Sequence, residues 1–418
     1  MHYFSYKGRD FFCEETKVCS IAQKFGTPLY VYSKRTIFRH FHKIKEAFAS
    51  INPLICYSVK ANSNLSILNT LVREGAGLDI VSGGELFRAK KVNCPPQRVV
   101  YASVGKTDEE IKDAIKYGIL LFNVESLGEL AQINKIAGQL SENVDVTLRI
   151  NPDIEPKTHK YITTGRKETK FGMDINTARK VFLKRGDFRF LKIRGVHIHI
   201  GSQITQSSPF IKAIKKVKGL IDDIKKEGIN LKYFNIGGGL GIVYDKEKPQ
   251  TAKVFADRVL PLLKAISLKT ILEPGRFIVG NAGILITKVL YVKDTPSKKF
   301  IIVDAGMNDL LRPSLYEAYH RIVPLDRKPK TKDRRPKKAD VVGPICESGD
   351  FLGKGRKLDV EKGDYLAVLG AGAYGFSMSS NYNSRRLTGE VLVDADKVYC
   401  IRERQNYSDL ISKECIVT

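Results

Sequence analysis

The stretch PLICYSVKANSNLSILNTLVREGAGLDIVS, residues 53–82, decides the fold class. It opens with an apolar, β-branched run (53–60), continues with apolar residues at helical spacing, and closes with a second apolar run (78–82). A strand, a helix and a strand in this order predict two parallel strands joined by a crossover helix. The alternation continues through further strand candidates at 98–103, 119–124, 144–151, 193–201, 231–239 and 269–275.

Eight strand candidates between residues 53 and 275 match a (β/α)8 barrel in number and size. A doubly wound open sheet is the alternative, and periodicity alone does not decide between them. We therefore expect an α/β chain with a barrel over residues 36–280.

After about residue 280 the pattern changes to strand-like runs with few helices between them. These runs lie at 283–293, 298–306, 338–348, 364–372 and 389–403. They predict a mostly antiparallel β domain, and the N-terminal run TPLYVYS (27–33) could join it because chain termini often lie close together. We expect this second domain to comprise residues 1–35 and 281–418.

The composition is that of an ordinary globular protein, with 418 residues, 43% hydrophobic and 28% charged. No run of 18 apolar residues is present, and the N-terminal stretch lacks an apolar segment. We therefore expect no membrane partner, no signal peptide and, by default, a cytoplasmic location. The seven cysteines form no CxxC pair, which favours reduced thiols over a zinc site or a disulfide framework.

The formal net charge of +25 raises the question of a polyanion partner. The densest basic stretch, RKPKTKDRRPKK (327–338), contains prolines and almost no apolar residue, so it predicts an exposed loop. The remaining surplus is mostly Lys spread over helical faces. A solvated Lys-rich surface accounts for this pattern better than a binding site, and we expect no nucleic-acid partner.

The chemistry-bearing residues follow the expected barrel strands, at the end where barrel active sites lie. Lys60 closes the first strand, and His199 lies near the end of the sixth. A half-buried lysine can act as an amine nucleophile, but taken alone Lys60 is more typical of a surface residue. His199 alone is more typical of a satisfied core histidine.

Glycines change this interpretation. Gly237, Gly238 and Gly239 follow the seventh strand, and Gly275 lies in EPGR after the eighth. Three consecutive glycines can be only a tight turn, but their bare N–H groups can also approach a phosphate closely. Phosphate sites in such barrels often use these two loops. A phosphate site beside an imine-forming lysine points to pyridoxal phosphate (PLP), whose ring nitrogen Glu273 could pair with.

A resemblance supports this interpretation. The segments YSVKAN, HIHIGSQ, GGGLGI, EPGR, DAGMNDLLRPSLY, GPICES and GAYGFSMSSNYNSR occur in this order between residues 57 and 385. Together they resemble the diaminopimelate decarboxylases, which belong to the alanine-racemase-like barrel class of PLP enzymes. YSVKAN and EPGR are shared with ornithine and arginine decarboxylases, whereas the last three segments are more specific.

The resemblance implies a homodimer with active sites shared across its interface, and it implies a role for each matching residue. Lys60 would carry PLP as a Schiff base, His199 would stack on its ring, and Cys346 of the partner subunit would be the third catalytic residue. The cofactor would be bound by Lys60, Asp79, His199, Ser202, Gly237, Gly238, Gly239, Glu273, Pro274, Gly275, Arg276 and Tyr374. The substrate would be bound by Arg276, Arg312, Tyr316, Glu347 and Tyr374. We expect no metal.

The implied reaction converts meso-diaminopimelate, an amino-acid substrate, to L-lysine and CO2, the last step of lysine biosynthesis. Cys346 is our candidate for the acid that protonates Cα, although an isolated cysteine is more often an inert buried thiol. Arg276 and Arg312 suit the distal carboxylate, and Glu347 suits the distal ammonium. Lysine or ornithine would leave two buried arginines unpaired, which should cost several kcal/mol.

Two alternatives stay open. Another decarboxylase of the same class could act on arginine, ornithine or a carboxylated polyamine, although Arg312 and the CES segment argue against it. A non-catalytic PLP-binding protein could keep the lysine and the phosphate loops, but it would need neither the second domain nor Cys346 and Tyr374. One departure from the family is visible, since SRRLTGEV stands where a proline-containing sequence is usual, and it puts only the local loop geometry in doubt.

Overall fold

The computed structural model describes residues 2–155, 165, 169–327 and 337–417. The chain divides into two compact units. The barrel unit comprises His40–Ile242 and Lys248–Phe277, and the β unit comprises Met1–Arg39, Val243–Glu247 and Ile278–Thr418. Both ends of the chain therefore contribute to the β unit.

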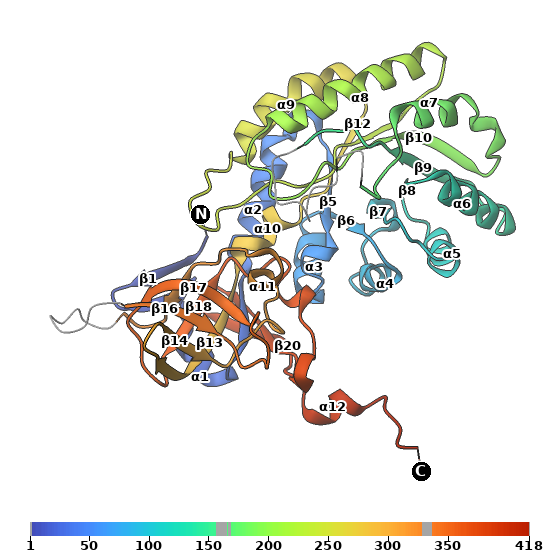
Figure 1. The fold of residues 1–418 in the computed structure, drawn as a ribbon. Coiled ribbons are helices and arrows are strands. Elements are labelled where there is room, and N and C mark those ends of the chain that lie inside the picture. Colours follow the sequence, from blue (N-terminus) through green and yellow to red (C-terminus); the bar gives the residue numbers. More distant parts are fainter. Residues whose placement is uncertain (1, 156–164, 166–168, 328–336, 418) are drawn as a thin grey trace. The chain divides into compact units, whose positions relative to one another are not determined.

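Within the described residues of the barrel unit, eight parallel strands close into a barrel, which confirms the predicted fold and rules out the open sheet (Figure 1). Neighbouring strands follow the chain order, and the last strand pairs with the first through Ile271 and Leu54. The strands are β5 (Leu54–Ser58), β6 (Gly77–Ile80), β7 (Val99–Ala102), β8 (Leu121–Val124), β9 (Val144–Arg149), β10 (Leu191–His197), β11 (Tyr233–Asn235) and β12 (Lys269–Leu272).

The helices that link these strands lie around the outside of the barrel (Figure 1). Most begin at a side chain that accepts a hydrogen bond from the first turn; α5, for example, starts with a capping box of Thr107 and Glu110 and ends at Gly118. Such a cap stabilises a helix by about 1 kcal/mol. The linking helices are α3 (Leu65–Arg73), α4 (Gly83–Lys91), α5 (Asp108–Tyr117), α6 (Leu127–Gln139), α7 (Ile175–Leu183), α8 (Ser208–Lys226) and α9 (Ala252–Ile266). Helix α2 (Lys34–Ala47) precedes β5, and α10 (Arg276–Val279) follows β12.

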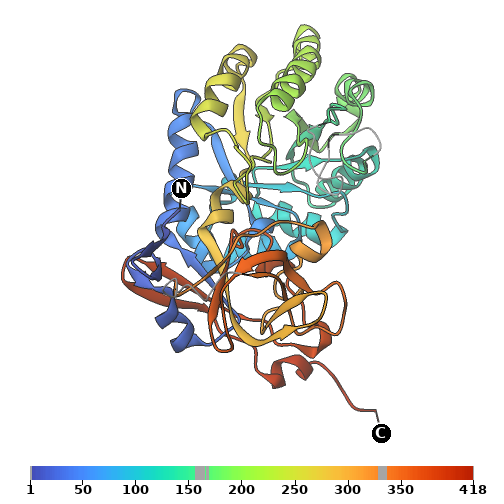
Figure 2. The same cartoon turned by 60° about the vertical axis from the view of Figure 1, so that its left-hand side comes forward.

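The β unit is a mostly antiparallel sheet in the order β17-β16-β14-β13-β4-β19-β20, with β15 and β18 attached to β13. Its strands curl into a rounded layer (Figure 2). Only the pairs β4–β19 and β14–β16 are parallel among the pairings of this sheet in the described residues. The strands are β13 (Gly283–Asp294), β14 (Lys299–Val303), β15 (Ile322–Pro324), β16 (Lys337–Val342), β17 (Phe351–Leu358), β18 (Tyr365–Leu369), β19 (Gly389–Asp394) and β20 (Lys397–Arg402).

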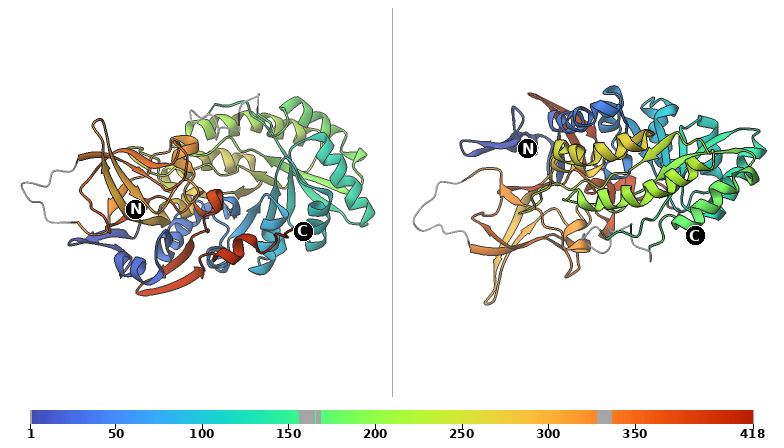
Figure 3. Two further views of the ribbon diagram at one scale, coloured as in Figure 1. Left: turned by 60° about the horizontal axis from the view of Figure 1, so that its bottom comes forward. Right: turned by 90° about the horizontal axis from the view of Figure 1, so that it is seen from above.

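The N-terminal residues join the β unit, as predicted. β4 (Leu29–Ser33) pairs with β13 on one side and with β19 on the other. The blue N-terminal segment therefore lies beside the red C-terminal strands (Figure 3). The short strands β1 (Phe4–Lys7), β2 (Asp10–Cys13) and β3 (Thr16–Lys17) pair with one another, and α1 (Val18–Phe25) packs into the same apolar core as β4 and β13.

Parts of the β unit differ from the prediction. The run 389–403, expected as one strand, is a hairpin of β19 and β20 that turns at Ala395, where φ is +57°. β15 and β17 were not predicted. Two short helices complete the unit, α11 (Arg312–Tyr316) and α12 (Tyr407–Ile411). Most of the basic stretch 327–338 lies outside the described residues, so its expected loop stays a prediction.

All seven cysteines are free thiols. Among the described residues, no helix combines the length and the apolar character needed to span a membrane.

Candidate active site

Lys60 lies two residues beyond the end of β5, in a short 3-10 turn (Val59–Ala61). Its Nζ atom is 3.0 Å from Oδ2 of Asp79 on β6, and a third of its side-chain surface, 33%, stays exposed. The hydroxyl of Ser58 donates to the same Oδ2 atom at 2.7 Å. Burial and the charge of Glu273 raise the pKa of Asp79, whereas Lys60 opposes this. The amine is thus held at a strand end by a buried acid.

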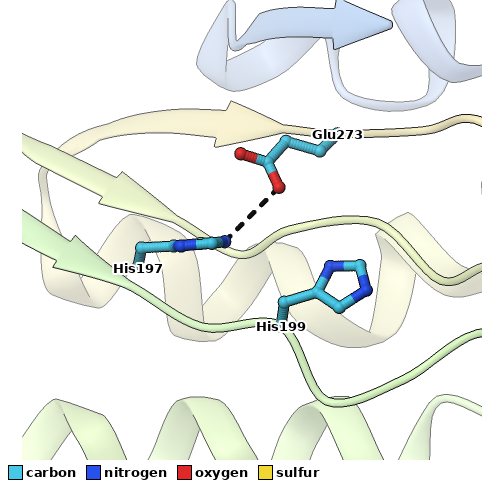
Figure 4. A group of neighbouring side chains, drawn as sticks. All are labelled: His197, His199 and Glu273. Atoms are coloured by element: carbon cyan, nitrogen blue, oxygen red, sulfur yellow. Dashed lines mark ion pairs between the residues drawn. The ribbon is translucent and has the colours of Figure 1, made fainter. Parts of the chain in front are cut away.

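Glu273, which follows β12, is a buried carboxylate with several partners. Its Oε1 atom accepts hydrogen bonds from the side-chain amides of Asn235, at 2.5 Å, and Asn123, at 3.2 Å. Its Oε2 atom lies 3.3 Å from Nε2 of His197 (Figure 4). Burial alone would raise the pKa of Glu273, but the neighbouring side chains of His197 and Lys60 lower it below its ordinary value. Glu273 is therefore an ionised acceptor inside the barrel.

His199 is a neutral imidazole with a defined tautomer. Nδ1 of its ring accepts a hydrogen bond from the N–H of Gly238 at 3.3 Å, so the ring proton of the neutral form is on Nε2. Burial lowers the pKa of His199 well below its ordinary value, and the charges of Arg149 and Lys60 lower it further. A flat, uncharged ring next to Glu273 suits stacking on an aromatic cofactor (Figure 4).

The three glycines after β11 are required by close backbone contacts. A Cβ atom on Gly238 would lie 1.9 Å from the carbonyl oxygen of Glu273, and one on Gly239 would lie 2.2 Å from that of Gly201. Gly237 and Gly239 also have φ angles of +68° and +97°, in the region that favours glycine. The loop can therefore approach the segments that follow β12 and β10 only without side chains.

Two of the three glycine N–H groups are already engaged within the protein. Gly237 donates to the side-chain oxygen of Asn235 at 2.9 Å, and Gly238 donates to His199. Within the described residues, no acceptor is found for the N–H of Gly239. Of this motif, Gly239 is thus the donor that a phosphate could use.

The loop after β12 brings further predicted residues to the same barrel end. Nη2 of Arg276 donates to the hydroxyl of Ser202 at 3.1 Å. The carbonyl of Pro274 accepts the N–H of Ser58 at 3.2 Å, and a Cβ atom on Gly275 would lie 3.0 Å from that of Ser58. The Ser202, EPGR and Lys60 segments are thus packed together.

His197, His199 and Glu273 each offer one atom that could hold a metal ion, and these atoms lie within 4.8 Å of one another (Figure 4). Lys60 and Arg149 place positive charge beside this cluster. Glu273 already accepts a hydrogen bond from Asn235, and His199 already accepts one from Gly238. This donor set fits the nitrogen and the face of a pyridine ring, with an anionic acceptor and a neutral ring, and the glycine loop offers a phosphate donor.

The remaining predicted residues belong to the β unit. Arg312 begins α11 and is buried, and Tyr316 ends the same helix. Tyr374 has a φ angle of +56°, in the left-handed region that is uncommon for a residue with a large side chain.

Cys346 and Glu347 lie in an exposed loop between β16 and β17. The N–H of Cys346 donates to the side-chain oxygen of Asn383 at 3.0 Å. The hydroxyl of Tyr382 donates to Oε2 of Glu347 at 2.9 Å. These two hydrogen bonds therefore join the GPICES and SSNYN segments, which are far apart in the sequence.

The sequence analysis did not identify the residues that contact the predicted site residues and fix their positions. The signal for His197 was present, because residues i and i+2 of a strand face the same side and HIH therefore pairs His197 with His199. Asn123 and Asn235 were visible as single polar residues in otherwise apolar strands. Nothing in the spacing marked Asn383 or Tyr382 as partners of the cysteine loop.

Comparison with known proteins decides the family. The family model of the pyridoxal-dependent decarboxylases, pyridoxal binding domain, matches residues 34–280. The diaminopimelate decarboxylase of Aquifex aeolicus is 51% identical over 411 residues, which is 98% of this chain and 96% of that protein. This chain belongs to the diaminopimelate decarboxylase family.

Two further relatives agree. The diaminopimelate decarboxylase of Haemophilus influenzae is 47% identical over 418 residues, 100% of both chains. The crystal structure of the Helicobacter pylori diaminopimelate decarboxylase, complexed with L-lysine, superimposes with a TM-score of 0.90 at 44% identity, covering 95% of this chain and 99% of that one. The resemblance inferred from the motifs is therefore confirmed, and members of this family are PLP-dependent carboxy-lyases.

Proposed function

We propose that this protein decarboxylates meso-diaminopimelate at its D-centre and produces L-lysine and CO2, with PLP as cofactor. The observation that carries the proposal is the grouping of Lys60, neutral His199 and ionised Glu273 at one end of the barrel beside a glycine loop. Bound PLP supplies an electron sink for the bond that releases CO2.

The barrel residues bind and orient the cofactor. Lys60 attaches it covalently through Nζ, with Asp79 compensating the charge of the free amine. Glu273 holds a proton on the ring nitrogen, because its lowered pKa keeps it ionised and acceptor-only. His199 stacks on the ring without adding charge. The N–H of Gly239, the hydroxyl of Ser202 and the backbone of Gly275–Arg276 hold the phosphate, with Gly237 and Gly238 shaping the loop.

Substrate specificity comes from charge. Arg276, Arg312 and Tyr316 bind the distal carboxylate, and Glu347 binds the distal ammonium. A substrate without the distal carboxylate would lack the charge-assisted hydrogen bonds to Arg276 and Arg312, at a cost of several kcal/mol. Tyr374 contacts cofactor and substrate.

We further propose that the protein is a homodimer, in which Cys346 and Glu347 act in the site of the partner subunit. Cys346 protonates Cα after CO2 has left. The exposure of both residues in the single chain is consistent with such a role. A cytoplasmic location stays a prediction of the sequence.

The test is CO2 release by purified protein with PLP, comparing meso-diaminopimelate, L-lysine, L-ornithine and L-arginine. We expect release from diaminopimelate alone, with lysine formed. Release from another amino acid would keep the chemistry but contradict the charge argument. If PLP binds and none of the four releases CO2, the alternative of a non-catalytic PLP-binding protein is correct.

A further inference from the structure

Arg312, the proposed ligand of the distal carboxylate, contacts a buried histidine, His320, that was not among the residues predicted from the sequence. Nη1 of Arg312 lies 2.7 Å from Nε2 of His320, whose side chain is fully buried at 0% exposure. The other ring nitrogen, Nδ1, lies 2.8 Å from the carbonyl oxygen of Leu369 on β18.

These two contacts fix the tautomer of His320. A carbonyl oxygen only accepts hydrogen bonds, so Nδ1 of His320 carries the proton that is donated to Leu369. Nε2 of the neutral ring is then an acceptor, and a guanidinium group only donates, so Arg312 donates to it. His320 thereby connects Arg312 to the backbone of a central strand of the β unit.

Tyr244 completes the support. The guanidinium carbon of Arg312 lies 4.5 Å from the centre of the Tyr244 ring, within cation–π range. The same ring meets His320 edge-on, at 5.1 Å between ring centres. The backbone N–H of Tyr244 is in turn bound by the carboxylate of Glu247 at 2.9 Å. The hydrogen bond to His320 therefore fixes the direction of Nη1 of Arg312, and the Tyr244 ring fixes the orientation of the guanidinium plane.

We propose that His320, together with Tyr244, is a positioning residue that sets the orientation of Arg312 for substrates with a distal carboxylate; this inference rests on the proposed function of Arg312. Both supporting groups are uncharged, so they orient the guanidinium without neutralising it as a carboxylate would. A guanidinium held in one orientation is prepared for bidentate pairing with the substrate carboxylate, so less reorganisation is needed when the substrate binds.

Two substitutions at His320 separate its two hydrogen bonds. In His320→Asn the side-chain amide can replace Nδ1 and keep the bond to Leu369, but nothing reaches Arg312. In His320→Gln the longer side chain can replace Nε2 as the acceptor for Arg312. Both variants remove the ring, so a difference between them reports on the bond to Arg312 and not on the lost ring volume.

The measurement is calorimetric binding of two compounds to the PLP-loaded protein. L-Lysine, bound as the reaction product with its side-chain amine at the reacting end, keeps the carboxylate of the distal end, whereas 1,5-diaminopentane has no carboxylate. We expect His320→Asn to bind L-lysine about 10- to 100-fold more weakly, the loss of a hydrogen bond to a charged group, with diaminopentane binding unchanged. His320→Gln should retain most of the affinity for L-lysine. In turnover, His320→Asn should raise KM for diaminopimelate more than it lowers kcat.

Tyr244→Leu provides an independent variant, with Tyr291→Leu as its control because Tyr291 is 58% exposed in the same unit. We expect Tyr244→Leu to weaken L-lysine binding about 3-fold by loss of the cation–π contact, and Tyr291→Leu to leave it unchanged. Thermal unfolding of each variant identifies any that fails to fold.

An Arg312→Met variant separates the positioning role of His320 and Tyr244 from the proposed role of Arg312 in substrate binding. If Arg312→Met does not weaken L-lysine binding, the proposed role of Arg312 is wrong and the inference fails with it. If Arg312→Met weakens L-lysine binding but His320→Asn and Tyr244→Leu do not, only the positioning role is overturned. Equal weakening of L-lysine and diaminopentane by His320→Asn would also overturn it, because that pattern indicates a general structural role.

Discussion

Substitution of Gly238 by alanine tests how the glycine loop is built. The new Cβ atom would lie 1.9 Å from the carbonyl oxygen and 2.8 Å from the carbonyl carbon of Glu273. Real Cβ atoms essentially never come closer than 3.0 Å to another heavy atom, so the loop and the end of β12 must separate by about 1.1 Å. Both partners are backbone, and neither can move by a simple side-chain rotation.

This separation also affects bonds that hold Glu273. Its N–H donates to the carbonyl of Gly237 at 2.8 Å, and its carboxylate accepts from Asn235 at 2.5 Å. A movement of this size takes the backbone bond beyond hydrogen-bonding distance, which costs about 1 kcal/mol, and the overpacking itself costs about 1–3 kcal/mol. We expect a loss of about 2–4 kcal/mol in the free energy of unfolding, and a melting temperature lower by about 2–5 °C.

Cofactor binding should fall as well, because the proposed phosphate donor on Gly239 and the proposed ring-nitrogen partner Glu273 move apart. We expect the affinity for PLP, measured by fluorescence titration of the apoprotein, to decrease by at least about 10-fold. Gly219→Ala is the matched control: Gly219 lies on the exposed side of α8 with no atom within 4 Å of the added Cβ. Alanine favours a helix there, so stability should be unchanged or slightly higher.

Thermal unfolding by circular dichroism and the PLP titration, carried out on both variants, check this reasoning. If Gly238→Ala matched Gly219→Ala in both measurements, the close approach of the loop to β12 would not be what requires glycine.

Lys60→Ala should remove the visible absorbance of the lysine-bound cofactor, and an unchanged spectrum would disprove the attachment. Lys60→Ala and Cys346→Ala, each inactive alone, should regain part of the activity when mixed, because one site of the mixed dimer has both residues; no recovery after verified subunit exchange would contradict the role of Cys346 in the partner site. His199, with its lowered pKa, stays neutral in the folded protein while the unfolded chain is protonated below its ordinary value of 6.5, so its contribution to stability is lost as the pH falls through 6.5. Urea unfolding of the apoproteins measures how much the free energy of unfolding falls between pH 7 and pH 5.5. We expect this fall to be about 1 kcal/mol smaller in His199→Phe than in the parent protein. Equal falls in the two proteins would contradict the neutral state of His199.

The barrel was predictable because its strands and helices alternate in the sequence at regular spacing, and the pattern repeats enough times to favour a closed sheet. The β unit was less predictable. β17 contains Lys354, Arg356 and Lys357 within eight residues, so it lacks a clear apolar run. β19 and β20 are separated only by a turn at Ala395–Asp396, which no glycine or proline marks. Local patterns fix elements well where burial is strong and poorly where one face is solvated.

The candidate site shows the same division. Lys60, His199 and the two glycine-containing loops were found because strand ends in a barrel meet at one edge. Which side chains hold them was not visible, because that depends on barrel closure. Asn123 on β8 and Asn235 on β11 meet at Glu273 from non-adjacent strands. No spacing in the sequence encodes that three-way contact.

The glycine motif shows how the missed residues change the interpretation of the found ones. From the sequence, GGG predicted a cradle of N–H groups for phosphate. In the structure, the N–H of Gly237 fixes Asn235, which binds Glu273, and the N–H of Gly238 fixes the tautomer of His199. The motif therefore links the proposed ring-nitrogen partner, the proposed stacking residue and the phosphate donor through consecutive backbone groups. Because one backbone segment sets all three, a small shift in this loop should disturb every contact to the cofactor together, whereas substitutions of the individual side chains should disturb them one at a time.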